Sequence, residues 1–199
     1  MPTTPGSSAP APPDGPLIVQ SDRTVLLEAA HPAADDARRA IAPFAELERA
    51  PEHIHTYRIT PLALWNARAA GLDAETVVHV LVTYSRFPVP HALLTEIAET
   101  MGRYGRLQLV ADPAHGLVLH AADRPVLEEV MRSKRTAGML GERLGDTDVV
   151  IHSSERGRLK QALIKLGWPA EDLAGYVDGE AHPIALAEDP AAPSSCPSA

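Results

Sequence analysis

The chain has 199 residues, which is enough for one domain or two small ones. Its formal net charge of −8 argues against a dedicated nucleic-acid-binding protein, although one local basic face is compatible with that charge. The single cysteine, Cys196, excludes an internal disulfide and a cysteine-based zinc site, and it fits a reducing compartment.

The hydropathy pattern contains neither a secretion signal nor a membrane span. The first residues lack the basic and apolar segments of a signal peptide. No apolar run reaches the roughly 18 residues that a membrane helix needs. We therefore expect a cytoplasmic protein that makes no contact with a membrane.

Both ends of the chain have a simple composition. Residues 1–16 hold six prolines among small polar residues, so they cannot bury enough apolar area to offset the entropy of ordering. We predict a disordered tail over residues 1–15 and an acidic, proline-rich tail over residues 177–199. Charge is also unevenly spread, because residues 170–199 carry six acids and no base, whereas residues 55–169 carry a net charge of +2.

The ordered part begins with short β-rich segments. Residues 17–20 and 24–29 are apolar runs on either side of a turn, which predicts two strands. A helix is expected over residues 33–42, where a proline follows it. Residues 53–59 alternate between polar and apolar side chains and are predicted to be extended.

Three amphipathic helices are predicted between residues 60 and 103. Thr60 and Pro61 form a strong helix start, with threonine at the N-cap and proline at the first helical position. The inward face of this helix is predicted to hold Leu62, Trp65 and Ala69. Asp73 is expected to cap the second helix, and the third is expected over residues 91–103.

After residue 103, the spacing of the apolar residues changes from the helical period to alternation with polar residues. Residues 106–110 and 117–120 are predicted to form a hairpin. Three short helices followed by a hairpin is the order of a winged helix, so we predict an α+β fold with a winged-helix-like module and small sheets over residues 16–122. The outward acids Glu96 and Glu99 on the third helix favour a protein partner over base readout, because they would face the phosphates.

A small α/β unit is predicted over residues 123–176. It would contain a helix from 125 to 133, a strand from 149 to 151 and an amphipathic helix from 155 to 166. Ser153 or Ser154 is expected to cap the last helix, which ends at a glycine, Gly167.

No catalytic motif is found in the sequence. The glycine-rich phosphate loop G-x-x-x-x-G-K-[ST] and the H-E-x-x-H pair are both absent, so we predict neither a catalytic residue nor a bound cofactor. His53 and His55 would share one face of a strand, where Glu52 and His31 could complete a metal site. Nothing in the spacing demands three or four ligands, so structural histidines are favoured and no metal is predicted, with a metal site as the alternative.

Basic residues gather in two places, around a helix end near residue 133 and along the last helix. Around the helix end they complement the helix dipole, which is the simpler interpretation. Along the last helix they flank an apolar stripe, where a solvated border is favoured and contact with nucleic-acid phosphates is the alternative. The candidate DNA-binding residues are Arg132, Lys134, Arg135, Arg156, Arg158, Lys160 and Lys165.

Three separated blocks give the sequence a family resemblance. The segments GPLIVQSDRTVLLEA, HIHTYRITPLALWNARAAG and LIKLGWPAEDLAGYVDGEAHPI resemble the actinobacterial XPB-type helicases, and the first two also resemble the eukaryotic XPB subunit. The resemblance covers about residues 15–186. It implies the N-terminal accessory region of an ATP-dependent 3′–5′ DNA helicase of superfamily 2, acting in nucleotide excision repair.

The resemblance also implies what the chain would lack and what it would bind. The family uses ATP and Mg²⁺ in a motor that follows this region, whereas this sequence ends in AEDPAAPSSCPSA, so we expect no ATPase activity from it. The implied partners are the helicase motor domains or a repair protein, and DNA bound weakly and without sequence preference. The alternative is a free-standing winged-helix regulator that binds DNA.

Overall fold

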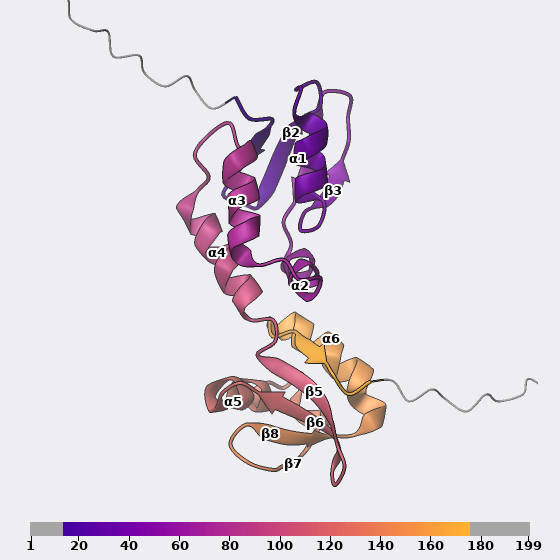
Figure 1. Cartoon of the computed structure of the whole chain (residues 1–199). Coiled ribbons are helices and arrows are strands. Elements are labelled where there is room, and N and C mark those ends of the chain that lie inside the picture. Colours follow the sequence, from indigo (N-terminus) through magenta and orange to yellow (C-terminus); the bar gives the residue numbers. More distant parts are fainter. Residues whose placement is uncertain (1–13, 176–199) are drawn as a thin grey trace, which may run out of the picture.

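A computed structural model describes residues 14–175 (Figure 1). The predicted tails, residues 1–15 and 177–199, lie outside the described residues except for Asp14 and Gly15. The described chain forms two lobes, each with its own antiparallel or mixed sheet and its own hydrophobic core. We call residues 14–102 the first lobe and residues 107–175 the second lobe. The predicted α+β class is confirmed, because helices and two small sheets share the chain.

The sheet of the first lobe has four antiparallel strands in the order β1-β2-β4-β3. The strands are β1 (Leu17–Val19), β2 (Thr24–Glu28), β3 (Glu46–Arg49) and β4 (Ile54–Arg58). The predicted hairpin β1–β2 and the predicted extended segment at β4 are confirmed. Strand β3 was not predicted, since it is exposed along its whole length and shows no alternation of apolar residues.

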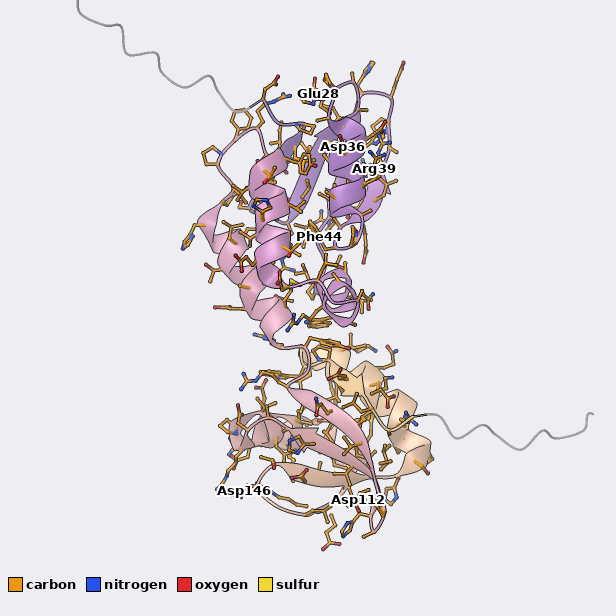
Figure 2. The ribbon with its side chains drawn as sticks, viewed as in Figure 1. Glu28, Asp36, Arg39, Phe44, Asp112 and Asp146 are labelled. Carbon is orange, nitrogen blue, oxygen red and sulfur yellow. The ribbon has the colours of Figure 1, made fainter. Side chains whose placement is uncertain are left out.

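Four helices complete the first lobe. They are α1 (Ala34–Ile41), α2 (Pro61–Ala69), α3 (Ala74–Tyr84) and α4 (His91–Gly102). The Thr60 hydroxyl accepts a hydrogen bond from the Ala63 backbone N–H at 3.1 Å, so the predicted start of α2 is confirmed. Asp73 caps α3 in the same way, at 2.7 Å from the Thr76 N–H. Phe44, labelled in Figure 2, is fully buried in the core of this lobe.

The predicted inward face of α2 is wrong in part. Trp65 is buried, with 5% of its surface exposed, and its indole N–H donates to the Thr100 carbonyl oxygen at 2.8 Å. Leu62 is 46% exposed and Ala69 is also exposed. The buried residues of α2 are instead Ala63, Leu64, Trp65 and Ala67. Helical spacing allows two overlapping apolar faces on α2, and packing against α4 selects between them.

The sheet of the second lobe has five strands in the order β7-β8-β6-β5-β9. The strands are β5 (Leu107–Asp112), β6 (Gly116–Ala121), β7 (Leu140–Arg143), β8 (Asp148–Ile151) and β9 (Ala170–Asp172), and β9 pairs with β5 in parallel. The helices are α5 (Arg124–Arg132) and α6 (Arg156–Leu166), with single 3₁₀ turns at η1 (Ala137–Met139) and η2 (Ser153–Glu155). Strands β7 and β9 were not predicted.

The hairpin β5–β6 belongs to the second core, whereas the predicted winged-helix-like module of residues 16–122 grouped it with the three helices before it. Leu107, Leu109 and Leu119 are fully buried there, together with side chains of α5 and α6. The chain therefore passes from the first hydrophobic core to the second between Met101 and Leu107. Alternation along the hairpin gives it one apolar face, and the helices that cover this face come later in the chain.

The ends of α6 show one error and one confirmed prediction. Neither Ser153 nor Ser154 caps the helix, because both lie in η2 and the N-cap residue Glu155 makes no side-chain capping bond. Gly167 ends the helix with φ +88°, a left-handed conformation that glycine adopts without strain.

The two lobes meet around Trp168. The guanidinium groups of Arg103 and Arg106 lie 5.2 and 5.6 Å from the centroid of the Trp168 ring, within the range of cation–π attraction. Arg103 also donates a hydrogen bond from Nη1 to the Gly167 carbonyl oxygen at 3.4 Å. These contacts anchor the end of α6 to the short segment that joins the lobes. Figure 1 shows α6 beside this segment.

Candidate nucleic-acid interface

Two of the predicted DNA-binding residues, Arg156 and Lys160, form ion pairs with an acid of the second lobe. The Asp172 carboxylate accepts hydrogen bonds from Arg156 Nε at 3.1 Å, from Arg156 Nη2 at 2.5 Å and from Lys160 Nζ at 2.8 Å. Burial raises the pKa of the Asp172 carboxyl group, but these hydrogen bonds outweigh it and leave the pKa below its usual value. Because Asp172 is only 12% exposed, we assign Arg156 and Lys160 to the joint between α6 and β9.

Three other predicted residues converge on one surface groove. Arg135 follows α5, and its Nη1 donates to the Lys165 carbonyl oxygen at 3.3 Å, which joins the α5 end to the last turn of α6. Arg158 and Lys165 lie on the same side of α6. We call this the basic groove, a hollow of 590 Å³ lined by Arg135, Met139, Gly157, Arg158, Gln161, Ala162 and Lys165.

The cations of the basic groove differ in their pairing. Arg158 Nη1 lies 3.1 and 2.9 Å from the two carboxylate oxygens of Glu155. Within the described residues, neither Arg135 nor Lys165 forms an ion pair, and both side chains are exposed. Gly157 has open space where a side chain would stand, so the middle of the groove is not obstructed. A phosphate group could therefore approach two cations that have no ion pair, Arg135 and Lys165, and one arginine that is paired with Glu155.

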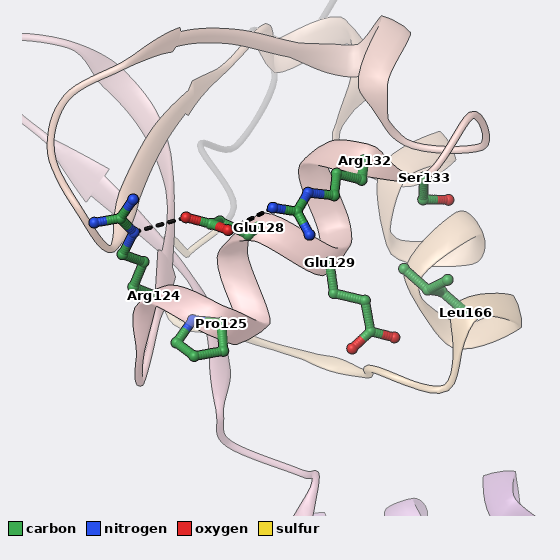
Figure 3. A pocket seen from close by; sticks show the side chains of 7 residues that line it. All are labelled: Arg124, Pro125, Glu128, Glu129, Arg132, Ser133 and Leu166. Carbon is green, nitrogen blue, oxygen red and sulfur yellow. Dashed lines mark hydrogen bonds and ion pairs between the residues drawn. The ribbon is translucent and has the colours of Figure 1, made fainter.

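Arg132 and Lys134 lie outside the basic groove. Arg132 borders a different hollow beside α5, where Glu128 accepts hydrogen bonds from Arg124 at 2.6 Å and from Arg132 at 2.9 Å (Figure 3). The hydrogen bond from Arg124 is the main reason that the pKa of Glu128 lies below its usual value. Lys134 is exposed and has no ion pair among the residues that the structure describes. The seven predicted residues thus do not form one surface.

A third hollow of 520 Å³ lies between the lobes. The acids Glu96 and Glu99 of α4 border it together with the exposed side chain of Leu62 and, from the second lobe, Lys165. Glu96 forms an ion pair with Arg23. The outward acids of α4 therefore border the hollow between the lobes, and Glu96 is held by an arginine of the first lobe.

The histidine pair does not gather further ligands. His53 is exposed just before β4, whereas His55 is half-buried and its Nδ1 has no hydrogen-bond partner. Over residues 14–175 there is no group of three or more side chains placed to hold a metal ion. No helix in the same range is long and apolar enough to span a membrane.

Comparisons with known proteins place the chain in a family. The family model of the helicase conserved C-terminal domain matches residues 17–145. The chain belongs to this family. It is 72% identical over 176 residues to the DNA 3′-5′ helicase XPB of Mycobacterium tuberculosis and 70% identical over 176 residues to that of Kineococcus radiotolerans. Each alignment covers 88% of this chain and 32% of the relative, so the chain spans about a third of their length.

More distant members share a smaller part. The chain is 31% identical over 111 residues, 56% of its length and 14% of the relative, to the XPB helicase/translocase subunit of the general transcription and DNA repair factor IIH of Schizosaccharomyces pombe. The resemblance to XPB-type helicases that the sequence blocks indicated is therefore confirmed.

Three residues that matter for the interface were not identified from the sequence. Glu155 has a local signal, since an acid three residues before Arg158 on a helix is within reach of it. Gln161 follows one turn later on the same side. Asp172 has no local signal, because only the pairing of β9 with β5 brings it beside α6.

Proposed function

We propose that this chain is an accessory region of an XPB-type 3′–5′ DNA repair helicase that precedes the motor and binds DNA by its phosphates in the basic groove. The assignment to an XPB-type helicase rests on the family membership and on the names of the bacterial relatives, which are DNA 3′-5′ helicases. The accessory role and the position before the motor rest on the resemblance of the three sequence blocks, whereas the family model itself is described as a helicase C-terminal domain. The observation that carries the DNA contact is the convergence of Arg135, Arg158 and Lys165 on one hollow. The protein partner would be the helicase motor or a repair protein, in the cytoplasm.

The chemistry of the groove favours the DNA backbone over the bases. Lysine and arginine contact phosphates without reading sequence, and each contact releases counterions. Among the residues that the structure describes, no aromatic side chain lines the groove, so they offer no stacking platform for a single-stranded base. Binding should therefore be weak, independent of sequence and strongly reduced by salt.

Two features argue for an accessory role over the alternatives. The sequence holds no glycine-rich phosphate loop, so ATP and Mg²⁺ would be bound by a motor and not by these residues. For a free-standing winged-helix regulator, α4 would be the reading helix, yet its acids Glu96 and Glu99 border the hollow between the lobes. That placement disfavours readout of bases by α4.

The test is fluorescence anisotropy of a labelled DNA duplex over a range of salt concentrations. The groove variant carries Arg135, Arg158 and Lys165 changed to alanine. The control variant carries the same charge change at exposed residues outside the groove, Arg39, Arg124 and Arg132. If three phosphates are bound, the log–log slope of affinity against salt should lose about 3 units in the groove variant. Equal affinities and slopes for the two variants would refute the proposed surface.

A further inference from the structure

Glu155 is the acid that contacts a cation of the basic groove within the described residues. It stands at the N-cap of α6, and its two carboxylate oxygens lie 3.1 and 2.9 Å from Arg158 Nη1. The Glu155 side chain is held close to the protein and is 23% exposed, whereas the Arg158 side chain is 71% exposed. The arginine can therefore swing away from this pair, while the carboxylate remains at the N-terminal end of α6.

This pair differs from the ion pairs of Asp172 in how easily it can be displaced. Asp172 is 12% exposed and accepts hydrogen bonds from Arg156 and Lys160 of α6, so an anion from solvent would have to displace a nearly buried carboxylate to bind these two cations. Glu155 makes its contacts with one exposed arginine, and such surface pairs are weak. An anion that arrives in the groove can therefore compete for Arg158.

We propose that Glu155 is an internal competitor for phosphate, which makes the basic groove select a DNA backbone with adjacent phosphates over an isolated phosphate group. This inference rests on the proposed DNA-binding function. A single phosphate gains Arg135 and Lys165, the two cations without an ion pair among the described residues, but is repelled by the Glu155 carboxylate, which lies against Arg158. A continuous backbone held by those two cations presents a further phosphate to Arg158, at the high local concentration that tethering provides. That phosphate then replaces Glu155.

The same geometry predicts what happens when the carboxylate is neutralised. In Glu155→Gln, the amide keeps the size of the side chain and can still accept a hydrogen bond from Arg158, but it no longer repels phosphate. Helix capping should not change, because the Glu155 side chain makes no capping bond. We expect duplex DNA to bind about two- to five-fold more tightly, the range that corresponds to losing one weak surface ion pair. Inhibition of DNA binding by inorganic phosphate should also strengthen.

The experiment is anisotropy of the same labelled duplex with the full chain, at low salt and with added inorganic phosphate as competitor. Glu129→Gln is the matched control, since Glu129 is exposed on α5 outside the basic groove and its change alters net charge equally. Thermal melting checks that both variants fold. The double variant Glu155→Gln with Arg158→Ala should lose the gain, because Arg158 is the group that the competitor holds.

The possible outcomes separate this inference from the proposed function. A gain in Glu155→Gln that exceeds the gain in Glu129→Gln and disappears in the double variant supports the competitor role. Equal gains in the two single variants, or no gain in Glu155→Gln, overturn it while leaving the groove intact if the triple groove variant still loses binding. No binding by the wild type or by Glu155→Gln at low salt overturns both the competitor role and the proposed function.

Discussion

Replacing Asp172 by asparagine removes the charge that joins β9 to α6. The carboxylate accepts three charge-assisted hydrogen bonds from Arg156 and Lys160. The amide of asparagine has only one accepting oxygen, so it keeps some of these hydrogen bonds and places its N–H₂ group beside a cation. A hydrogen bond to a charged group contributes roughly 1.5–3 kcal/mol to the free energy of unfolding. Removing one partner of a fully buried ion pair lowers that free energy by about 3–5 kcal/mol. With Asp172 12% and Lys160 32% exposed, the joint is partly solvated. We expect Asp172→Asn to lower the free energy of unfolding by about 2 kcal/mol.

The effect should be visible by thermal melting. For a cooperative unit of the size of the second lobe, 1 kcal/mol corresponds to roughly 4–8 °C in Tm, so a fall of about 8–16 °C is expected if the lobe unfolds by itself. The matched control is Asp146→Asn, because Asp146 is 77% exposed in the loop between β7 and β8, at the far end of this lobe in Figure 2. Equal Tm values for the two variants would refute the reasoning that Asp172 holds β9 in place.

The Asp172 joint also predicts a pH dependence with a definite sign. The pKa of Asp172 is lower in the folded chain than the value of about 3.9 in the unfolded chain. At pH values between these two pKa values, the unfolded chain therefore binds more protons than the folded chain. The stability that Asp172 contributes is therefore fully present above the unfolded pKa and is lost as the pH falls through the folded pKa. The difference in stability between wild type and Asp172→Asn should be constant near neutral pH and should shrink from about pH 4 downward. A difference that grows on acidification would contradict this sign.

Three further predictions follow from the first lobe and from the sequence. Trp65→Ala should cost roughly 3–5 kcal/mol in unfolding experiments, as core truncations do, whereas the exposed Leu62→Ala should cost less than about 1 kcal/mol; similar costs would mean that the assigned face of α2 is wrong. Thr60→Ala should lower stability by about 1 kcal/mol through the lost cap, and Thr60→Ser should restore most of it. The purified chain should neither bind nor hydrolyse ATP, with or without DNA, and turnover above background would contradict the absence of a phosphate loop.

Signals within a few residues of each other predicted much of the local structure. Thr60 followed by Pro61 set the start of α2, Asp73 set the start of α3, and Gly167 set the end of α6, because caps and left-handed glycines act within one helical turn. The alternation of apolar residues predicted the hairpin β5–β6 and the strand β4 for the same reason. The family resemblance was likewise visible in three blocks of sequence.

Features that depend on distant partners could not be predicted in this way. Strand β3 is exposed throughout and exists through its backbone pairing with β4. The inward face of α2 depends on α4, so Leu62 was placed inside although it borders the hollow between the lobes.

The candidate interface shows the same division between local and distant causes. Composition and helical spacing identified the bases of α6, but they could not distinguish Arg156 and Lys160 from Arg158 and Lys165. The tertiary structure decides this, because β9 pairs with β5 and brings the Asp172 carboxylate within 3.1 Å or less of the first two. Arg135 reaches the other two only because α5 and α6 cover the same face of the second sheet. Electrostatic attraction depends on distance in space, so the sequence determined which residues carry charge and the fold determined which charges remain available for a ligand.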